Sequence, residues 1–181
     1  MSGPSLGVVA ATNELLISLE VTFVGGGQAA AVTEDAFELL LEPHTRLEAG
    51  LQPWGEIIAF GAALEWRSRF RSATGEALAA HEARLAARLR EGIAALPHVE
   101  LFSPIGSPLV TVRPLRVDAH RLAAFLAHAG IMVRSGYFCA HHWLQDREGL
   151  PPLVRFSVGA HNTDADVDQT LEVMGRLMRG L

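Results

Sequence analysis

Cys139 is the only cysteine among the 181 residues, and its neighbours are charged or flexible. Arg134 precedes it, His141 and His142 follow it, and Gly136 allows a sharp turn of the backbone. Because nearby positive charge and solvent access favour a thiolate, this segment could make Cys139 a nucleophile. The alternative is a small apolar side chain packed next to Phe138 and Ala140, which is common for an isolated cysteine.

A metal site formed by Cys139, His141 and His142 is a further alternative, since all three side chains can bind zinc. The spacing is unfavourable, because adjacent histidines point in different directions on most backbones and no fourth ligand is evident. A single cysteine also excludes an internal disulfide and any zinc site built from several cysteines. We therefore predict that the chain has no metal site.

Arg155 is the other residue whose position could serve chemistry, because it interrupts an apolar strand predicted over residues 153–158. Strand alternation places it on the face opposite Val154 and Phe156. Its forked donors could bind a carboxylate through two hydrogen bonds. The alternative is an outward-facing arginine on a half-exposed strand.

The second half of the chain carries the elements that would position these residues. Strands are predicted over residues 99–102, 109–113, 131–133 and 153–158, and helices over residues 74–95, 118–129 and 164–178. Thr74 and Asp118 are the expected N-caps of the first two helices, and residues 135–152 are expected to form the loop that carries Cys139. Helices packed on one face of a small sheet predict an α/β domain with α+β layering.

The first half of the chain has a less regular pattern. Strands are predicted over residues 6–10, 19–24 and 29–33, with Gly25-Gly26-Gly27 as the turn of a hairpin between the last two. An ordered loop is expected over residues 39–52. A helix is predicted from Pro53-Trp54-Gly55 to about Phe70, and its apolar residues are dense enough to predict that it is largely buried.

Composition limits the class of protein. The length and 49% hydrophobic residues suit one domain, or one domain with an attached arm, that buries a real core. The net charge of −5 and the scattered arginines argue against nucleic-acid binding. No apolar run reaches the roughly 20 residues that span a bilayer, and residues 1–4 do not open like a signal peptide. We therefore expect a cytoplasmic protein that does not bind membranes.

The chain contains fifteen arginines and no lysine. Nucleotide bias in a GC-rich genome could explain the rarity of surface lysines. Such bias would not remove a lysine that catalysis requires. The chain by itself therefore cannot form a lysine Schiff base.

Six segments, taken together, resemble a known family. They are Gly3-Pro4-Ser5-Leu6-Gly7-Val8, Gly25-Gly26-Gly27, Arg46-Leu47-Glu48-Ala49-Gly50, Gly55-Glu56-Ile57-Ile58-Ala59-Phe60-Gly61-Ala62-Ala63, Arg134-Ser135-Gly136-Tyr137-Phe138-Cys139-Ala140, and Arg155-Phe156-Ser157 with Asn162-Thr163. In the same order they look like the strand after the cofactor lysine, the triple-glycine hairpin, the Arg-Phe-Glu-Ala-Gly loop, the helix after it, the Arg-Thr-Gly-His-His-Cys-Ala persulfide loop and the Arg-Ala-Ser and Tyr-Asn-Thr end. From about Gly3 to Leu181 the chain thus resembles the C-terminal half of class V aminotransferase-fold enzymes that use pyridoxal 5'-phosphate (PLP), closest to group II cysteine desulfurases of the SufS/CsdA kind.

The resemblance implies a fold and a set of roles. Residues 54–181 would be the small C-terminal domain of a fold-type I PLP-dependent transferase, and residues 1–53 would be strands, a hairpin and an active-site loop left from the large domain. Cys139 would carry the persulfide, Arg155 would clamp the substrate carboxylate, and Arg134 would be a second active-site arginine. The cofactor-proximal residues would be Gly50, Leu51 and Gln52. Since family members are dimers with shared active sites, a large and obligate interface is also implied.

The sequence departs from the family at several of these positions. The segment with the PLP lysine, the ring-stacking histidine and the pyridine-binding aspartate would lie before Met1. Leu51 stands where the family has a threonine that reaches the PLP phosphate of the other subunit. Tyr137 and Phe138 replace the two histidines before the cysteine, and His141-His142 replaces the usual Gln-Pro or Met-Pro.

Three interpretations remain open. In the first, the chain is the small subunit of a split cysteine desulfurase, inactive alone, that converts cysteine to alanine with a persulfide on Cys139 and holds PLP only together with a lysine-bearing partner. The start at Met1, just past the lysine motif, favours it. In the second, the chain is a non-catalytic structural or regulatory subunit, or a sulfur acceptor, and Leu51 marks decay. In the third, it is a fragment of a longer class V PLP enzyme, which could also be a lyase, an epimerase or an aminotransferase. A separate sulfur-acceptor protein is a further possible partner.

Overall fold

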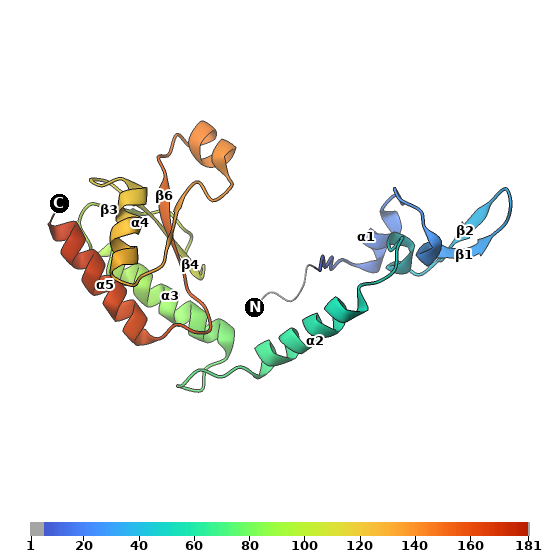
Figure 1. Cartoon of the computed structure of the whole chain (residues 1–181), viewed down its shortest axis with the longest axis horizontal. Helices are drawn as coiled ribbons and strands as arrows, with labels where there is room; N and C mark the ends of the chain where they lie inside the picture. Colours follow the sequence, from blue (N-terminus) through green and yellow to red (C-terminus); the bar gives the residue numbers. More distant parts are fainter. Residues whose placement is uncertain (1–5, 181) are drawn as a thin grey trace. The chain divides into compact units, whose positions relative to one another are not determined.

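The computed structural model describes residues 6–180 and divides the chain into two compact units, Met1–Ser68 (unit 1) and Arg69–Leu181 (unit 2) (Figure 1). The division of the family's domains at residues 53 and 54 stays a prediction. The Gly3-Pro4-Ser5 part of the first matching segment lies outside the described residues.

Unit 2 is built on an antiparallel sheet with three helices beside it (Figure 1). The strands, in the spatial order β3-β4-β6-β5, are β3 (Val99–Leu101), β4 (Leu109–Pro114), β6 (Leu153–Ser157) and β5 (Arg134–Gly136). The long helices are α3 (Leu78–Ala94), α4 (Ala119–His128) and α5 (Asp164–Arg179). This layered α/β architecture confirms the predicted fold class.

The core of unit 2 lies between the helices and one face of the sheet. Val110 and Val112 on β4 and Val154 and Phe156 on β6 are at most 4% exposed and pack against apolar side chains of all three helices. Since side chains alternate along a strand, the residue between Val154 and Phe156 projects from the other face. That residue is Arg155, as the sequence predicts.

One of the two predicted helix caps of unit 2 is confirmed. Asp118 caps α4, because its Oδ1 accepts hydrogen bonds from the backbone N–H groups of the next helical turn at 2.9 and 3.1 Å. The prediction for Thr74 is wrong. Its hydroxyl donates to Glu76 Oε2 at 2.9 Å within a turn, and α3 begins later, with Ala77 at the N-cap position.

The strand predicted over residues 131–133 is also wrong. Gly130 N donates to Ala127 O at 3.0 Å and Ile131 N donates to Leu126 O at 2.9 Å, with Gly130 at a φ of +80°. This is a Schellman motif, so the segment closes the C-terminus of α4 before the strand β5 begins at Arg134. The predicted loop over residues 135–152 in turn contains a short π-helix, His142–Arg147.

Unit 1 differs more from its prediction. It contains α1 (Asn13–Ser18), β1 (Ala29–Val32), β2 (Phe37–Leu39) and α2 (Trp54–Arg69), with 3-10 turns at Gly26–Gln28 and Thr45–Leu47. No strand forms over residues 6–10 or 19–24, and the hairpin joins β1 to β2 through residues 33–36. The predicted loop over residues 39–52 therefore contains the end of β2 and one of the 3-10 turns. The glycines predicted as a hairpin turn instead form the other.

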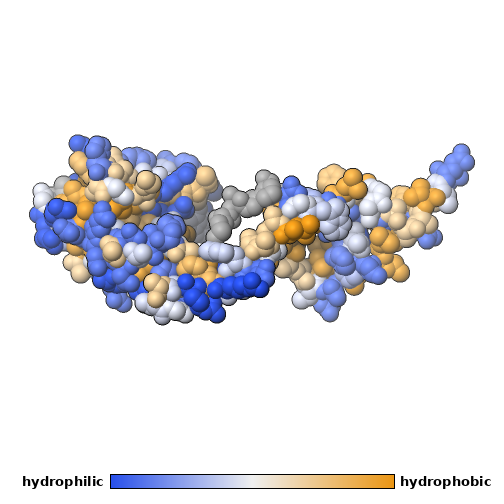
Figure 2. Space-filling model, turned by 60° about the horizontal axis from the view of Figure 1, so that its bottom comes forward, coloured by the Kyte–Doolittle hydropathy of each residue, from blue (hydrophilic) through white to orange (hydrophobic). Residues whose placement is uncertain are grey.

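Helix α2 has the predicted extent, but the prediction that it is largely buried is wrong. Trp54 is 66% exposed, Ile58 is 72% exposed, and no residue of the helix is buried. Among residues 6–68, Gln28 is the one residue that is buried. Figure 2 shows apolar side chains at the surface of this unit. Unit 1 thus has no hydrophobic core of its own.

Among the described residues, no helix combines the length and the apolar character needed to cross a membrane.

Candidate active site

Two arginines of unit 2 lie opposite each other on neighbouring strands. Arg134 of β5 and Arg155 of β6 are Cα partners in the antiparallel ladder, so their side chains leave the same face of the sheet. Like charges in such a pair destabilise a sheet by up to about 1 kcal/mol. Within residues 6–180 no carboxylate pairs with either arginine. The pair would therefore be stabilised by an anion bound between the two guanidinium groups.

Arg155 is half-buried, and one aromatic ring lies against it. Its Cζ is 4.9 Å from the ring centroid of Phe138, which is a cation–π contact. Its Nε is buried and makes no hydrogen bond to any described residue. On the other side of β6 its Cα partner is Thr111 of β4. The terminal N–H groups of Arg155 are thus the donors that a bound carboxylate would meet.

The loop that carries Cys139 leaves β5 through three residues with positive φ. Gly136 has a φ of +117°, Phe138 of +53° and Cys139 of +65°. Two consecutive left-handed residues other than glycine cost about 1–2 kcal/mol each, and such conformations concentrate at functional sites. The turn is closed by a hydrogen bond from Ala140 N to Tyr137 O of 2.8 Å.

Cys139 itself is exposed. The alternative in which it is a packed apolar side chain therefore does not describe this structure. The thiol lies at the surface, one residue after the ring that stacks on Arg155. The exposed position leaves the thiol accessible to a reacting molecule.

The histidines after the cysteine have other neighbours. His142 Nδ1 lies 3.2 Å from Asp146 Oδ2, one helical turn away. The ring of His141 lies 5.1 Å from that of Tyr137, measured between centroids. In the part of the chain that the structure describes, no group of three or more His, Cys, Asp or Glu side chains could hold a metal ion.

A contact between α4 and β5 was not predicted. His120 Nδ1 lies 2.9 Å from Ser135 Oγ, and the His120 ring would lie 3.7 Å from a Cβ built on Gly136. This pair fixes the start of the Cys139 loop to the helix. The two residues are fifteen positions apart, and the sequence carries no signal that would join them.

The triple glycine and the Arg46–Gly50 loop form one structural piece in unit 1. Gln28, which follows the glycines, accepts a hydrogen bond from Gly25 N at 2.9 Å and donates one to Arg46 O at 2.6 Å. A Cβ on Gly25 would clash with Ala49 O, and one on Gly27 would lie 2.9 Å from Glu48 O. The glycines are therefore needed for this close approach of two backbone segments.

The predicted cofactor-proximal residues follow directly after that piece. Leu51 is fully exposed at 101%, and Gln52 Nε2 donates weakly to Gly50 O at 3.5 Å. Gly50, Leu51 and Gln52 belong to unit 1, whereas Cys139, Arg134 and Arg155 belong to unit 2. The cofactor-proximal role of the first three stays a prediction.

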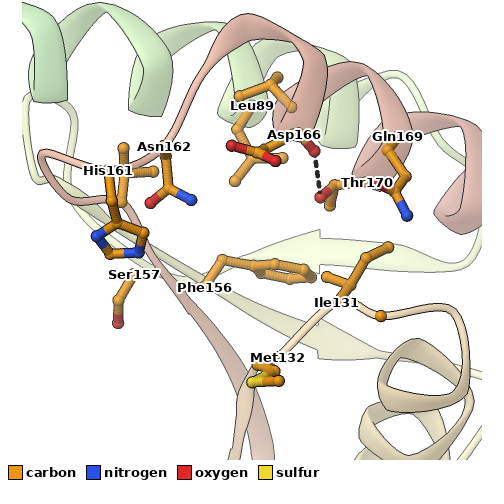
Figure 3. A pocket seen from close by; sticks show the side chains of 13 residues that line it. Leu89, Ile131, Met132, Phe156, Ser157, His161, Asn162, Asp166, Gln169 and Thr170 are labelled. Carbon is orange, nitrogen blue, oxygen red and sulfur yellow. Dashed lines mark hydrogen bonds between the residues drawn. The ribbon is translucent and has the colours of Figure 1, made fainter.

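A cavity of about 270 Å³ lies on the helix-covered side of the sheet (Figure 3). Phe156 and Ile131 line its apolar part, and polar side chains of α5 and of the preceding loop line the rest. Its polar groups are largely engaged: Thr170 Oγ1 donates to Asp166 O at 2.7 Å, and Asn162 Oδ1 accepts from Gly159 N at 3.0 Å. None of the predicted site residues lines it, so it is separate from the arginine pair.

Three carboxyl groups of unit 2 have lowered pKa values, and two of them form ion pairs with Arg84 of α3. Arg84 lies 3.0 Å from Glu76 Oε1 and 2.8 Å from Asp164 Oδ1, and its hydrogen bonds lower the pKa of both carboxyls. A hydrogen bond from Thr163 N lowers the pKa of Asp166 at the start of α5. These shifts serve the packing of α3 against α5 and lie outside the candidate site.

Comparison with known proteins identifies the family. Residues 1–170 match the aminotransferase class-V family. A cysteine desulfurase from Dickeya dadantii is 31% identical over 180 residues, a match that covers 98% of this chain and 42% of that protein. The chain thus spans about two fifths of the length of the curated relatives it matches.

Solved structures give the same result. The cysteine desulfurase CsdA from Escherichia coli, in its S-sulfonic acid form, superposes with a TM-score of 0.77 at 26% identity, over 94% of this chain and 41% of that one. The apo cysteine desulfurase from Thermococcus onnurineus superposes with a TM-score of 0.75 at 28% identity, over 93% of this chain and 42% of that one. The fold is therefore that of fold-type I PLP enzymes of the cysteine desulfurase type.

Proposed function

The chain belongs to the aminotransferase class-V family, and from that premise we propose that it supplies the thiol-bearing half of a PLP-dependent cysteine desulfurase. In this proposal it acts together with a separate, lysine-bearing chain. Cys139 accepts the sulfur atom of cysteine, and Arg155 with Arg134 binds the substrate carboxylate.

One observation carries the proposal. An exposed, left-handed Cys139 follows directly on a ring that stacks against Arg155. Arg155 in turn lies beside Arg134 on the neighbouring strand, on the same face of the sheet, and no carboxylate of the described residues pairs with either. Two guanidinium groups on one face suit a carboxylate bound through paired hydrogen bonds. A thiol one residue after the ring on Arg155 suits a substrate that carries both a carboxylate and a sulfur atom.

The reaction balances with this thiol as the acceptor. Cysteine loses its sulfur atom and becomes alanine, while the Cys139 thiol gains that sulfur atom and becomes a persulfide. The chain's residues bind the carboxylate, orient the substrate sulfur toward Cys139 and hold the product sulfur. A persulfide on an exposed side chain could then pass to a sulfur-acceptor protein.

The residues present do not suffice to hold PLP. The cofactor is bound through a lysine Schiff base, and this chain has no lysine. The lysine would therefore come from the partner chain. The electron-withdrawing chemistry of PLP would be available only in the complex.

Unit 1 supports the need for a partner. Gln28 is its one buried residue among residues 6–68, while Trp54, Ile58 and Leu51 are exposed. Exposed apolar surface of this kind marks a protein–protein interface. Because relatives of this chain are more than twice as long, a chain with the missing part of the family's sequence is the partner of matching chemistry.

The test is turnover of cysteine by the complex. With Cys139→Ala, we expect alanine and persulfide formation to fall at least about a hundredfold, while partner binding is unchanged. With Arg155→Met, we expect the KM for cysteine to rise about tenfold or more, because a buried charge-assisted pair is lost. Release of sulfide by the Cys139→Ala complex as fast as by the parent would contradict the proposal.

A non-catalytic subunit is the second candidate, and Leu51 favours it. A fully exposed leucine cannot donate the hydrogen bond that the family's threonine gives to the PLP phosphate. If this candidate holds, the chain binds its partner, but Cys139→Ala does not change the rate of cysteine turnover by the complex. Restoration of activity by Leu51→Thr would identify the leucine as the cause.

A further inference from the structure

We propose that Phe138 is a positioning residue that couples carboxylate binding at Arg155 to the placement of the Cys139 thiol. This inference rests on the proposed function and adds a residue to its site. Phe138 is one of the positions at which the chain departs from the family, so its role is a property of this chain.

The ring orients the guanidinium group. Phe138 lies on the face of Arg155, with 4.9 Å between Cζ and the ring centroid. Arg155 Nε has no hydrogen-bond partner and no carboxylate pairs with the side chain among the described residues, so the ring is a contact that can orient the guanidinium plane. A ring on the face leaves the in-plane N–H donors available for a carboxylate.

The same ring anchors the loop. Phe138 and Cys139 both have left-handed backbone conformations, with φ values of +53° and +65°. Such conformations persist only where the surroundings enforce them. The stacked ring fixes the backbone one residue before the thiol, so movement of the guanidinium on binding a carboxylate is transmitted to Cys139.

Two alkylating reagents of similar size test this coupling in the isolated full-length chain. Iodoacetate carries a carboxylate and iodoacetamide is neutral. In both reactions the Cys139 thiolate forms a C–S bond to the reagent's methylene carbon, and iodide leaves. The measured quantity is the rate with iodoacetate divided by the rate with iodoacetamide, which reports whether the thiol is placed beside a carboxylate-binding group.

We expect this ratio to be higher for Cys139 than for a cysteine peptide of the same local sequence. Phe138→Leu and Arg155→Met should each lower it by about threefold to tenfold, the range of a cation–π contact. The double variant should lower it no further, since both changes remove one coupled unit. Phe138→Tyr, which keeps the ring, should keep the wild-type ratio.

Trp143→Leu is the matched control. Trp143 also stacks on an arginine, with Arg147 Cζ 5.2 Å from its ring, but in the helix after the loop. This variant should leave the ratio unchanged. A Trp143→Leu effect as large as that of Phe138→Leu would show a general change of the loop and overturn the inference.

Further outcomes would overturn the coupling: an unchanged ratio in Phe138→Leu, a wild-type ratio equal to that of the peptide, or single effects that multiply in the double variant. These outcomes do not depend on turnover. If the ratio behaves as expected but the complex does not convert cysteine, the proposed function fails and the coupling stands. If the complex is active and the ratio is insensitive to Phe138, the coupling alone fails.

Discussion

The two units of this chain use the same kinds of residue to different ends. Unit 2 buries fifteen apolar residues in one cluster between three helices and a sheet, whereas unit 1 buries only Gln28 among its described residues. Both contain a long helix with many apolar side chains. In α3 six residues are buried, and in α2 none is.

This difference separates folding from assembly. Burial of apolar surface contributes about 25 cal/mol per Å² and is the main stabilising contribution to a fold. Unit 2 therefore has a source of stability, and unit 1 does not. We propose that the apolar residues of α2 serve an interface instead. The candidate site follows the same division, because Cys139, Arg134 and Arg155 belong to unit 2.

Separating the units should give the largest effect. Residues 69–181 should fold and unfold cooperatively, because they contain the whole core cluster. Residues 1–68 should remain unfolded alone, because no core compensates the loss of chain entropy. Circular dichroism and amide exchange measure both. A cooperative unfolding transition in residues 1–68 would contradict the comparison.

A matched pair of core and surface substitutions should give the next largest effect. Leu85→Ala in α3 should lower the free energy of unfolding by about 2–5 kcal/mol, because the side chain is fully buried. Ile58→Ala in α2 should leave the unfolding of the isolated chain nearly unchanged and weaken partner binding. Urea denaturation and titration calorimetry measure these two quantities. If Ile58→Ala destabilises the chain as much as Leu85→Ala, α2 is part of a core.

Substitution of two neighbouring glycines tests whether the Arg46–Gly50 loop of unit 1 contributes to partner binding. Gly25→Ala should weaken partner binding by about tenfold or more, since its Cβ would clash with Ala49 O and displace the Arg46–Gly50 loop. Gly26→Ala is the control, because a Cβ there meets nothing within 4 Å. Equal affinities of the two variants would mean that this loop does not contribute to the interface.

The smallest expected effect is the pH dependence of unit 2. Arg84 lowers the pKa of Glu76 and Asp164 below their usual values of 4.5 and 3.8. A lowered pKa in the folded state adds stability above the unfolded value, and that stability is lost as the pH falls through the folded pKa. Unit 2 should therefore lose stability from about pH 5 downward.

Arg84→Met should remove part of this acid sensitivity, as measured by denaturation between about pH 6 and about pH 3. The control is Arg176→Met, which breaks an exposed pair with Glu172 at 3.6 Å and should change little. An unchanged pH profile in Arg84→Met would assign the acid sensitivity to other groups.

The sequence predicted unit 2 better than unit 1 for a physical reason. Strong local signals coincide with burial in unit 2: Asp118 caps α4, and the apolar periodicity of α5 and β6 matches the faces that pack. In unit 1, apolar runs such as residues 19–24 look like strands, but no partner strand lies beside them. Patterns of burial predict structure only where the burying surface belongs to the same chain.

The sequence predicted the residue types of the candidate site but little of its geometry. Alternation along β6 is enough to place Arg155 away from the core. Its pairing with Arg134 depends on the register between β5 and β6, which the sequence does not reveal, and β5 begins at Arg134 rather than at the predicted residue 131. The stacking of Phe138 on Arg155 required two left-handed residues, a conformation that neither residue type signals.

We propose that this chain works only with a lysine-bearing partner. The most direct measurement is the visible absorption of the tagged chain purified from its own host, with mass identification of every copurified protein. We expect PLP absorption in a complex that contains a lysine-bearing chain of the aminotransferase class-V family. We expect no PLP absorption after that chain is removed. Full PLP absorption and cysteine turnover by the purified chain alone would contradict it.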